Sequence, residues 1–327
     1  MYLCLKSNVK ILKVSQRHVV RLLQTVFFSL ALVFLWFQLA DVDPGNWKQL
    51  GLSVLNNPYW LALIVAFTIL NWWLESKKWQ LLSEDFHSMS TAVSARAVLG
   101  GTYLSLFTPN RLGDLAGRIY LTPAGKRSKA ASTSAFGSLT QLTVTLVAGL
   151  IAVALLLFEK RGFEPLLIVT PLLLAAFFLI AFFRMDILWK NLLSKFSSRW
   201  SWLKRFHFDF SARKSHLALW LSLARYAVFS TQFLILLHLF GIDLPLWQAF
   251  AGIATTYLIS SVVPASILGE LGVRESVAIF IFGWLGQEAH PVFASTFTLW
   301  FFNLILPATL GGFFISSASA RFIRQRS

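Results

Sequence analysis

The sequence has 327 residues, of which 56% are hydrophobic and 13% charged. This apolar content is enough for about nine membrane spans of roughly 20 residues, and it excludes an ordinary soluble domain. Lys and Arg outnumber Asp and Glu by 29 to 14, which gives a net charge of +15. A single cysteine, Cys4, allows no disulfide framework, and the scattered histidines form no metal-ligand pattern. We therefore expect neither a metal site nor redox chemistry.

Apolar segments follow one another along the whole chain. Those long enough to cross a bilayer lie at 22–40, 58–74, 131–158, 165–183, 216–240 and 291–316. Three others are short or are interrupted by glycine, proline and charge, at 91–108, 247–263 and 272–286. The sequence therefore predicts an all-α integral membrane protein.

Basic residues are concentrated in one set of connections and acidic residues in the other. The basic set comprises 6–21, 77–96, 126–129, 184–214 and 321–326. The set in which acidic residues predominate comprises 41–57, 159–164, 241–246 and 287–290. Because Lys and Arg of short loops stay on the cytoplasmic side, the basic set is predicted inside and the acidic set outside. Both termini are then cytoplasmic.

This orientation predicts about eight transmembrane helices and leaves the segment 91–108 with cytoplasmic residues on both sides. A re-entrant hairpin would satisfy that constraint, and backbone at such depth is tolerated where protein buries it or where it lines a wet cavity. A helix lying in the membrane interface is the alternative.

Outside the membrane domain at 22–320, the sequence predicts a basic cytoplasmic arm at 1–21 and a basic tail at 321–327. The cytoplasmic connection 184–214 interleaves basic with aromatic residues, which is typical of an amphipathic stretch on anionic lipid. About 30 residues are too few for a folded basic module that binds nucleic acid, so we expect no nucleic-acid partner.

Two interrupted segments, 102–115 and 256–271, resemble each other. Both contain Thr-Tyr-Leu, a serine, a proline and then Gly-acid-Leu, and Arg118 and Arg274 each lie four residues beyond the acid. The first is predicted to enter from the cytoplasm and the second from outside, so the copies would be antiparallel. Paired Gly/Pro-interrupted segments of opposite orientation are typical of inverted-repeat transporters, whose binding site lies near the bilayer midplane.

The chemistry of the breaks identifies the candidate site. Proline stops a helix and frees carbonyls, while glycine lets the chain turn and lets a lipid headgroup approach the backbone. Buried charges need partners or water, so the acids and bases beside the breaks could balance one another when the site is empty and then exchange partners with a headgroup. A purely structural ion-pair cluster is the alternative. The candidate residues are Thr108, Pro109, Arg111, Gly113, Asp114, Arg118, Arg225, Pro264, Gly269, Glu270, Gly272, Arg274 and Glu275.

Arg225 differs from the others because it lies inside the apolar run 217–240. It could snorkel to the cytoplasmic interface, or it could pair with Asp114 or with a lipid phosphate. Lone polar residues in other spans, Gln141, Gln232 and Asn303, are predicted to make interhelical hydrogen bonds.

The two motifs resemble the signature segments of the lysylphosphatidylglycerol synthase transmembrane family, also called flippase-like domain proteins. The first signature, Thr-Pro-x-Arg-x-Gly-acid, is matched at 108–114. The second is a proline, a Gly-Gly pair and then Leu-Gly-Val-x-Glu, which is matched at Pro264 and 269–275 except that Glu270 replaces the second glycine. Because a carboxylate takes the place of glycine there, the headgroup preference stays open.

The resemblance implies a bacterial inner-membrane protein that binds a lipid between the two broken segments and moves its headgroup across the bilayer. The ligand would be an anionic or aminoacylated phospholipid. Its phosphate would meet Arg111, Arg118 or Arg274 and the N-termini of half-helices, while Asp114, Glu270 and Glu275 would hold an amine or a counter-charge.

Two-domain members of that family carry a soluble aminoacyl transferase. Since this chain stops at Ser327, we expect no such enzyme, no covalent chemistry and no cofactor. Two other readings stay open. One is a membrane-embedded enzyme acting on lipid-linked sugars or phosphates, although the acid clusters outside the motifs, Glu84-Asp85 and Asp41-Asp43, have no positioned basic partner visible in the sequence. The other is an accessory subunit of an envelope enzyme; a homodimer also stays open.

Overall fold

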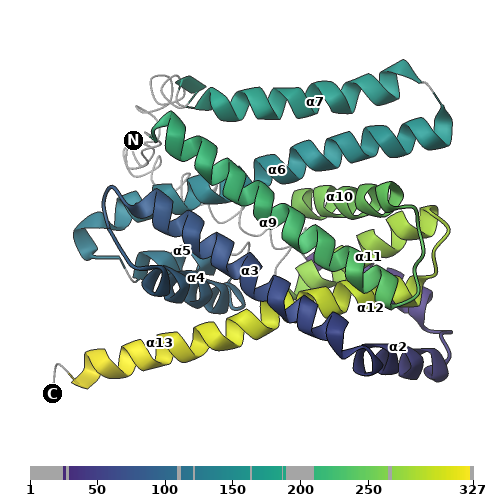
Figure 1. Ribbon diagram of the computed structural model, residues 1–327, viewed down its shortest axis with the longest axis horizontal. Helices are drawn as coiled ribbons and strands as arrows, with labels where there is room; N and C mark the ends of the chain where they lie inside the picture. Colours follow the sequence, from purple (N-terminus) through teal and green to yellow (C-terminus); the bar gives the residue numbers. More distant parts are fainter. Residues whose placement is uncertain are drawn as a thin grey trace, which may run out of the picture.

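The computed structural model describes residues 25–26, 29–108, 112–120, 122–162, 164–185, 187–188, 210–263 and 267–324, and every regular element within them is helical (Figure 1). The predicted arm at 1–21 and most of the amphipathic connection 184–214 lie outside the described residues. The described helices are, in order, Ser29–Leu39, α2 (Pro44–Asn56), α3 (Pro58–Ser83), α4 (Thr91–Ser105), α5 (Leu112–Tyr120), η2 (Ala124–Lys126), α6 (Arg127–Arg161), α7 (Pro165–Phe183), α9 (Ala212–Leu239), α10 (Leu246–Val262), α11 (Ile267–Trp284), α12 (Ala289–Trp300), the π-helix η4 (Phe301–Ile305) and α13 (Leu306–Arg324).

Several helix starts are set by side-chain caps that satisfy the first free amides. Asp43 accepts a hydrogen bond from the Gly45 amide at the start of α2, where Pro44 supplies a preset φ. Ser90 and Ser211 cap α4 and α9 in the same way. These caps determine where the chain leaves each connection and re-enters the helical core.

Five helical stretches of the described chain are long and apolar enough to cross a membrane: α3, α6, α7, α9 and Ala289–Ile315, which α12, η4 and α13 form together. The protein is therefore a multi-pass membrane protein, as the sequence predicts. The other three predicted crossings fall on Ser29–Leu39, α10 and α11, which are shorter or interrupted by charge.

The connections separate onto two opposite ends of the molecule (Figure 1). At the right of the figure lie α2 and the α6–α7, α9–α10 and α11–α12 connections, which form the acidic end. At the left lie the α3–α4 and α5–α6 connections, the start of α9 and the far end of α13, which form the basic end. The two sets of connections that the sequence separates by charge thus lie on opposite sides of the fold.

Each of the two interrupted segments forms a helical hairpin. The helix α4 has 15 residues and α5 has 9, so they rise only about 22 and 14 Å, too little for a hydrocarbon core of about 30 Å. The hairpin uses α5 as its return arm and is therefore larger than the predicted segment 91–108. Both of its ends lie at the basic end, whereas α10 starts and α11 finishes at the acidic end (Figure 1).

Glycines let the two arms of the first hairpin pack backbone against backbone. A Cβ atom at Gly113 would overlap the backbone of Leu104 and Ser105, and one at Gly117 would overlap Gly101. The space beside Gly113 is thus filled by α4 and is not open to a headgroup. The signature glycine serves the closure of the hairpin.

Candidate functional site

Both hairpins line one central cavity of about 520 Å³. The α4–α5 hairpin contributes Thr102, Ser105, Asp114 and Arg118, and the α10–α11 hairpin contributes Tyr257, Ser260, Ser261 and Arg274. The helices α3, α6, α9 and α12 and the π-helix η4 supply the remaining wall. The two similar sequence segments, which enter from opposite ends, therefore meet at the same space.

The hairpin tips also share an apolar support. Leu106 directly follows α4 and Leu271 is the fifth residue of α11, and both pack against the cluster formed by Trp300 and Leu304. Because these two residues of the continuous α12–α13 run contact both tips, the run fixes the tips relative to each other.

A buried carboxylate, Glu75 of α3, binds three cations in the cavity wall. Its oxygens lie 2.9 Å from Lys78 Nζ, 2.9 Å from Arg118 Nη2 and 3.0 Å from Arg225 Nη1. Only 4% of Glu75 is exposed. Desolvating one charge costs several kcal/mol unless opposite charges surround it, so this cluster is stable only while its members stay paired.

Sequence reasoning missed Glu75 and Lys78. The predicted span ended at residue 74, and the basic residues after it were assigned to a cytoplasmic connection. In the structure the same helix continues to Ser83. A carboxylate followed by lysine three residues later, at the end of an apolar run, is the signal that could have identified them, because an ionisable group within a span marks a functional site by default.

The first signature contributes one ion pair to this cluster. Arg118 Nη2 lies 2.9 Å from Asp114 Oδ2, one helical turn away, so Arg118 bridges Asp114 and Glu75. Thr108 accepts a hydrogen bond from the Gly113 amide at 2.6 Å and so caps α5. Pro109 and Arg111 lie outside the described residues.

The second signature forms a charge pair of which one member, Arg274, lines the cavity. Arg274 Nη2 lies 3.2 Å from Oε1 of Glu275, which is fully buried. Gly272 is buried, and its carbonyl accepts a hydrogen bond from Ser276. Pro264, the surroundings of Gly269 and the side chain of Glu270 are outside the described part of the chain. Arg274 is thus the described charge of this motif that lines the cavity.

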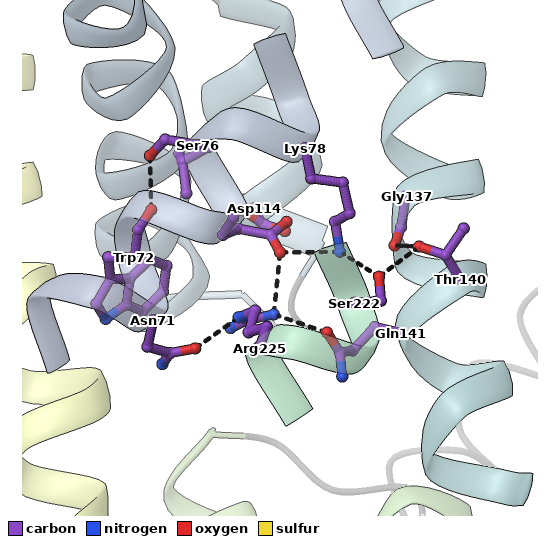
Figure 2. A network of polar contacts seen from close by, with 12 residues as sticks. Asn71, Trp72, Ser76, Lys78, Asp114, Gly137, Thr140, Gln141, Ser222 and Arg225 are labelled. Carbon is purple, nitrogen blue, oxygen red and sulfur yellow. Dashed lines mark hydrogen bonds and ion pairs between the residues drawn. The ribbon is translucent and has the colours of Figure 1, made fainter. Parts of the chain in front are cut away.

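Arg225 joins the cluster to a chain of amide side chains. Instead of pairing with Asp114, Arg225 binds Glu75. It also donates from Nε to Asn71 Oδ1 at 2.8 Å, a contact that Figure 2 shows. Asn71 then donates to Asn303 at 2.7 Å, and Asn303 donates to Gln232 at 2.7 Å. The snorkelling alternative is therefore wrong for this structure, because the guanidinium points to buried partners.

The predicted interhelical hydrogen bonds of the lone polar residues are confirmed. Gln232 and Asn303 join α9 to η4, and Gln141 of α6 accepts from Arg225 at 3.4 Å (Figure 2). Asn303 lies in the middle of η4, and single π-helical turns of this kind are rare and concentrate at functional sites.

Comparison with known proteins identifies the family. The family described as lysylphosphatidylglycerol synthase TM region matches residues 22–311. The chain belongs to this family. No curated protein matches the chain. The match includes both hairpins, the Glu75 cluster and the amide chain, so the whole cavity lies within the lysylphosphatidylglycerol synthase TM region.

The chemistry that this family member can support follows from its side chains. Among the described residues, no group of three His, Cys, Asp or Glu is placed to hold a metal ion. The carboxylates of Glu75 and Asp114 are both occupied by cations. The charged side chains that line the cavity are thus joined to one another by ion pairs and hydrogen bonds.

Proposed function

We propose that the protein is a lipid translocase that binds a phospholipid headgroup in the central cavity. One observation carries the proposal: two broken hairpins from opposite ends of the molecule line the same charged cavity. This is the arrangement expected of an inverted-repeat transporter with a site near the bilayer midplane. Membership of the lysylphosphatidylglycerol synthase TM region family supports it.

The division of the molecule into a charged interior and an apolar exterior supports the same function. Large apolar side chains of α7, such as Leu173, Phe177 and Ile180, are more than half exposed. This surface would face the hydrocarbon of the bilayer and contact the acyl chains of a lipid. The polar groups of the cavity would take the place of the water that hydrates its headgroup. Rocking of the two hairpins against each other would open the cavity to one leaflet and then to the other.

The protein performs no covalent chemistry in this proposal and needs neither cofactor nor nucleic acid. Membrane lipids are its partners. In the eight-span arrangement, the α4–α5 hairpin is re-entrant from the cytoplasm, whereas α10 crosses the membrane inward and α11 crosses back outward. The basic end and both termini then face the cytoplasm of a bacterial inner membrane.

Cysteine labelling tests this orientation. In a Cys4→Ser background, Glu288→Cys at the acidic end is expected to react with a membrane-impermeant thiol reagent on intact cells, because the acidic connections lie outside. Gly125→Cys, exposed at the basic end, should react only after permeabilisation. Labelling in the reverse order would overturn the orientation.

A lipid-movement assay tests the translocase proposal itself. Purified protein in liposomes is expected to speed the exchange of a fluorescent phospholipid between leaflets, measured by reduction of the outer-leaflet dye. Arg225→Gln should lower that rate at least tenfold, because Arg225 lines the cavity and ties Glu75 to the amide chain.

Lys214→Gln is the matched control, since Lys214 pairs at the basic end with Glu84 and Asp85, whose side chains are about two-thirds exposed. It should leave transport within about twofold of wild type, because exposed pairs contribute little. A wild-type rate no faster than that of protein-free liposomes would remove the proposal.

A further inference from the structure

The described carboxylates around the cavity are all paired with cations of the protein. Glu75 binds three, Asp114 binds Arg118 at 2.9 Å, and Glu275 binds Arg274 at 3.2 Å. These acids are thus neutralised without a ligand. A headgroup amine would have to displace an arginine or lysine from a buried contact before it could bind there.

Cations outnumber carboxylates in the same set of residues. Lys78, Arg118, Arg225 and Arg274 face Glu75, Asp114 and Glu275, so the set carries one excess positive charge. In a medium of low dielectric, such an excess attracts an anion and repels a cation much more strongly than in water. The charges of these described side chains therefore favour a negative headgroup.

Buried donor atoms on cavity-lining side chains supply a second, independent observation. Four nitrogen atoms have no hydrogen-bond partner within the described part of the chain: Trp72 Nε1, Gln141 Nε2, Arg274 Nε and Trp300 Nε1. All four can only donate. Leaving a buried donor unpaired costs about 1–3 kcal/mol. A ligand rich in acceptor oxygens would accept hydrogen bonds from these four nitrogen atoms.

We propose that this cavity selects an anionic phosphodiester headgroup, of the phosphatidylglycerol kind, over an aminoacylated one. This inference rests on the proposed lipid-binding function and narrows its substrate class. Arg225 and Arg274, which are the more exposed of the four cations at 18% and 14% of their side chains, meet the phosphate. The indole and amide donors meet its remaining oxygens and the glycerol hydroxyls.

The family name mentions a lysyl ester of the same lipid, which supplies a matched probe. Phosphatidylglycerol and lysylphosphatidylglycerol share the phosphodiester and differ in the added amines. For Asp114 and Glu275, the sequence left two alternative partners open, an amine or a counter-charge. We choose the counter-charge here, because arginines already occupy both carboxylates.

Native mass spectrometry of the purified full chain with an equimolar mixture of the two lipids tests the inference. Wild type is expected to retain phosphatidylglycerol at least about tenfold over the lysyl ester, since like-charge juxtaposition in a desolvated site is costly. Trp300→Phe and Trp72→Phe, which keep a ring but remove one donor each, should weaken phosphatidylglycerol binding severalfold. Trp284→Phe is the control, because its ring stacks under Lys160 at the acidic end.

The outcomes separate the inference from the function on which it rests. Equal retention of the two lipids, or preference for the lysyl ester, would overturn the headgroup assignment and leave translocation standing. Binding of neither lipid above a phosphatidylcholine background would contradict the proposed function itself. Displacement of phosphatidylglycerol by free glycerol phosphate at the same concentration would assign the site to a soluble anion.

Discussion

Glu75→Ala is expected to lower the free energy of unfolding by about 3–5 kcal/mol, because breaking a buried ion pair from one side leaves uncompensated charge. The carboxylate holds Lys78, Arg118 and Arg225 within 2.9–3.0 Å. Lys78 and Arg118 are almost fully buried and cannot reach water without moving their helices. A single substitution thus removes the shared partner of three helices.

Thermal or denaturant unfolding in detergent measures this loss. Glu84→Ala is the matched control, because Glu84 also pairs with a lysine, at 3.4 Å, but its side chain is 65% exposed. A second change, Lys78→Met in the Glu75→Ala background, should restore part of the stability, since it removes one of the stranded cations. If Glu75→Ala unfolded like the Glu84 control, the cluster would not hold the fold together.

The distribution of charge along the sequence predicted which connections lie at each end. This worked because the positive-inside bias acts on short loops, whose residues are fixed to one side by the spans beside them. Figure 1 shows the result at α2 and the α6–α7, α9–α10 and α11–α12 connections. The hairpins were also predictable, because Pro and Gly interrupt helices locally.

The partners of buried charges could not be predicted in the same way. Arg225 was expected to find Asp114 or a phosphate, yet it binds Glu75, which is 150 positions away in the sequence. Such a contact depends on how α3 packs along α9, and a single sequence carries no signal for that packing. The hydrogen bonds of the lone polar residues were easier to predict, because Gln232 and Asn303 lie in an apolar interior where a polar side chain must be hydrogen-bonded.

Glycine illustrates a third limit. At Gly113 the sequence shows only that a small residue follows a proline, which fits a turn, a ligand contact or close helix packing equally well. The structure selects close packing, because the α4 backbone fills the position of a Cβ. Gly117 is also required for close packing of α4 and α5, although it lies outside the signature motif.

Gly117→Val is expected to cost about 3 kcal/mol or more of stability and to abolish lipid movement. A Cβ at Gly117 would lie closer than 3.0 Å to backbone atoms of Gly101 and Gly100. A flexible side chain could yield to it, but backbone cannot, so α4 and α5 must separate. Overpacking a tight contact commonly costs 1–3 kcal/mol, and this one lies between two main chains.

The functional loss follows from the same displacement. Arg118 is the neighbour of Gly117 and holds Glu75 and Asp114 together, so a shift of α5 would break both ion pairs at once. Gly51→Val controls for the lower helix propensity of valine, because Gly51 lies inside α2 with nothing within 4 Å of its Cβ position. Unfolding curves and the leaflet-exchange assay, applied to both variants, measure the loss of stability and the loss of lipid movement. Normal transport by Gly117→Val would mean that the α4–α5 arms are free to separate, and the rigid hairpin would no longer explain how the first signature holds its charges in the cavity.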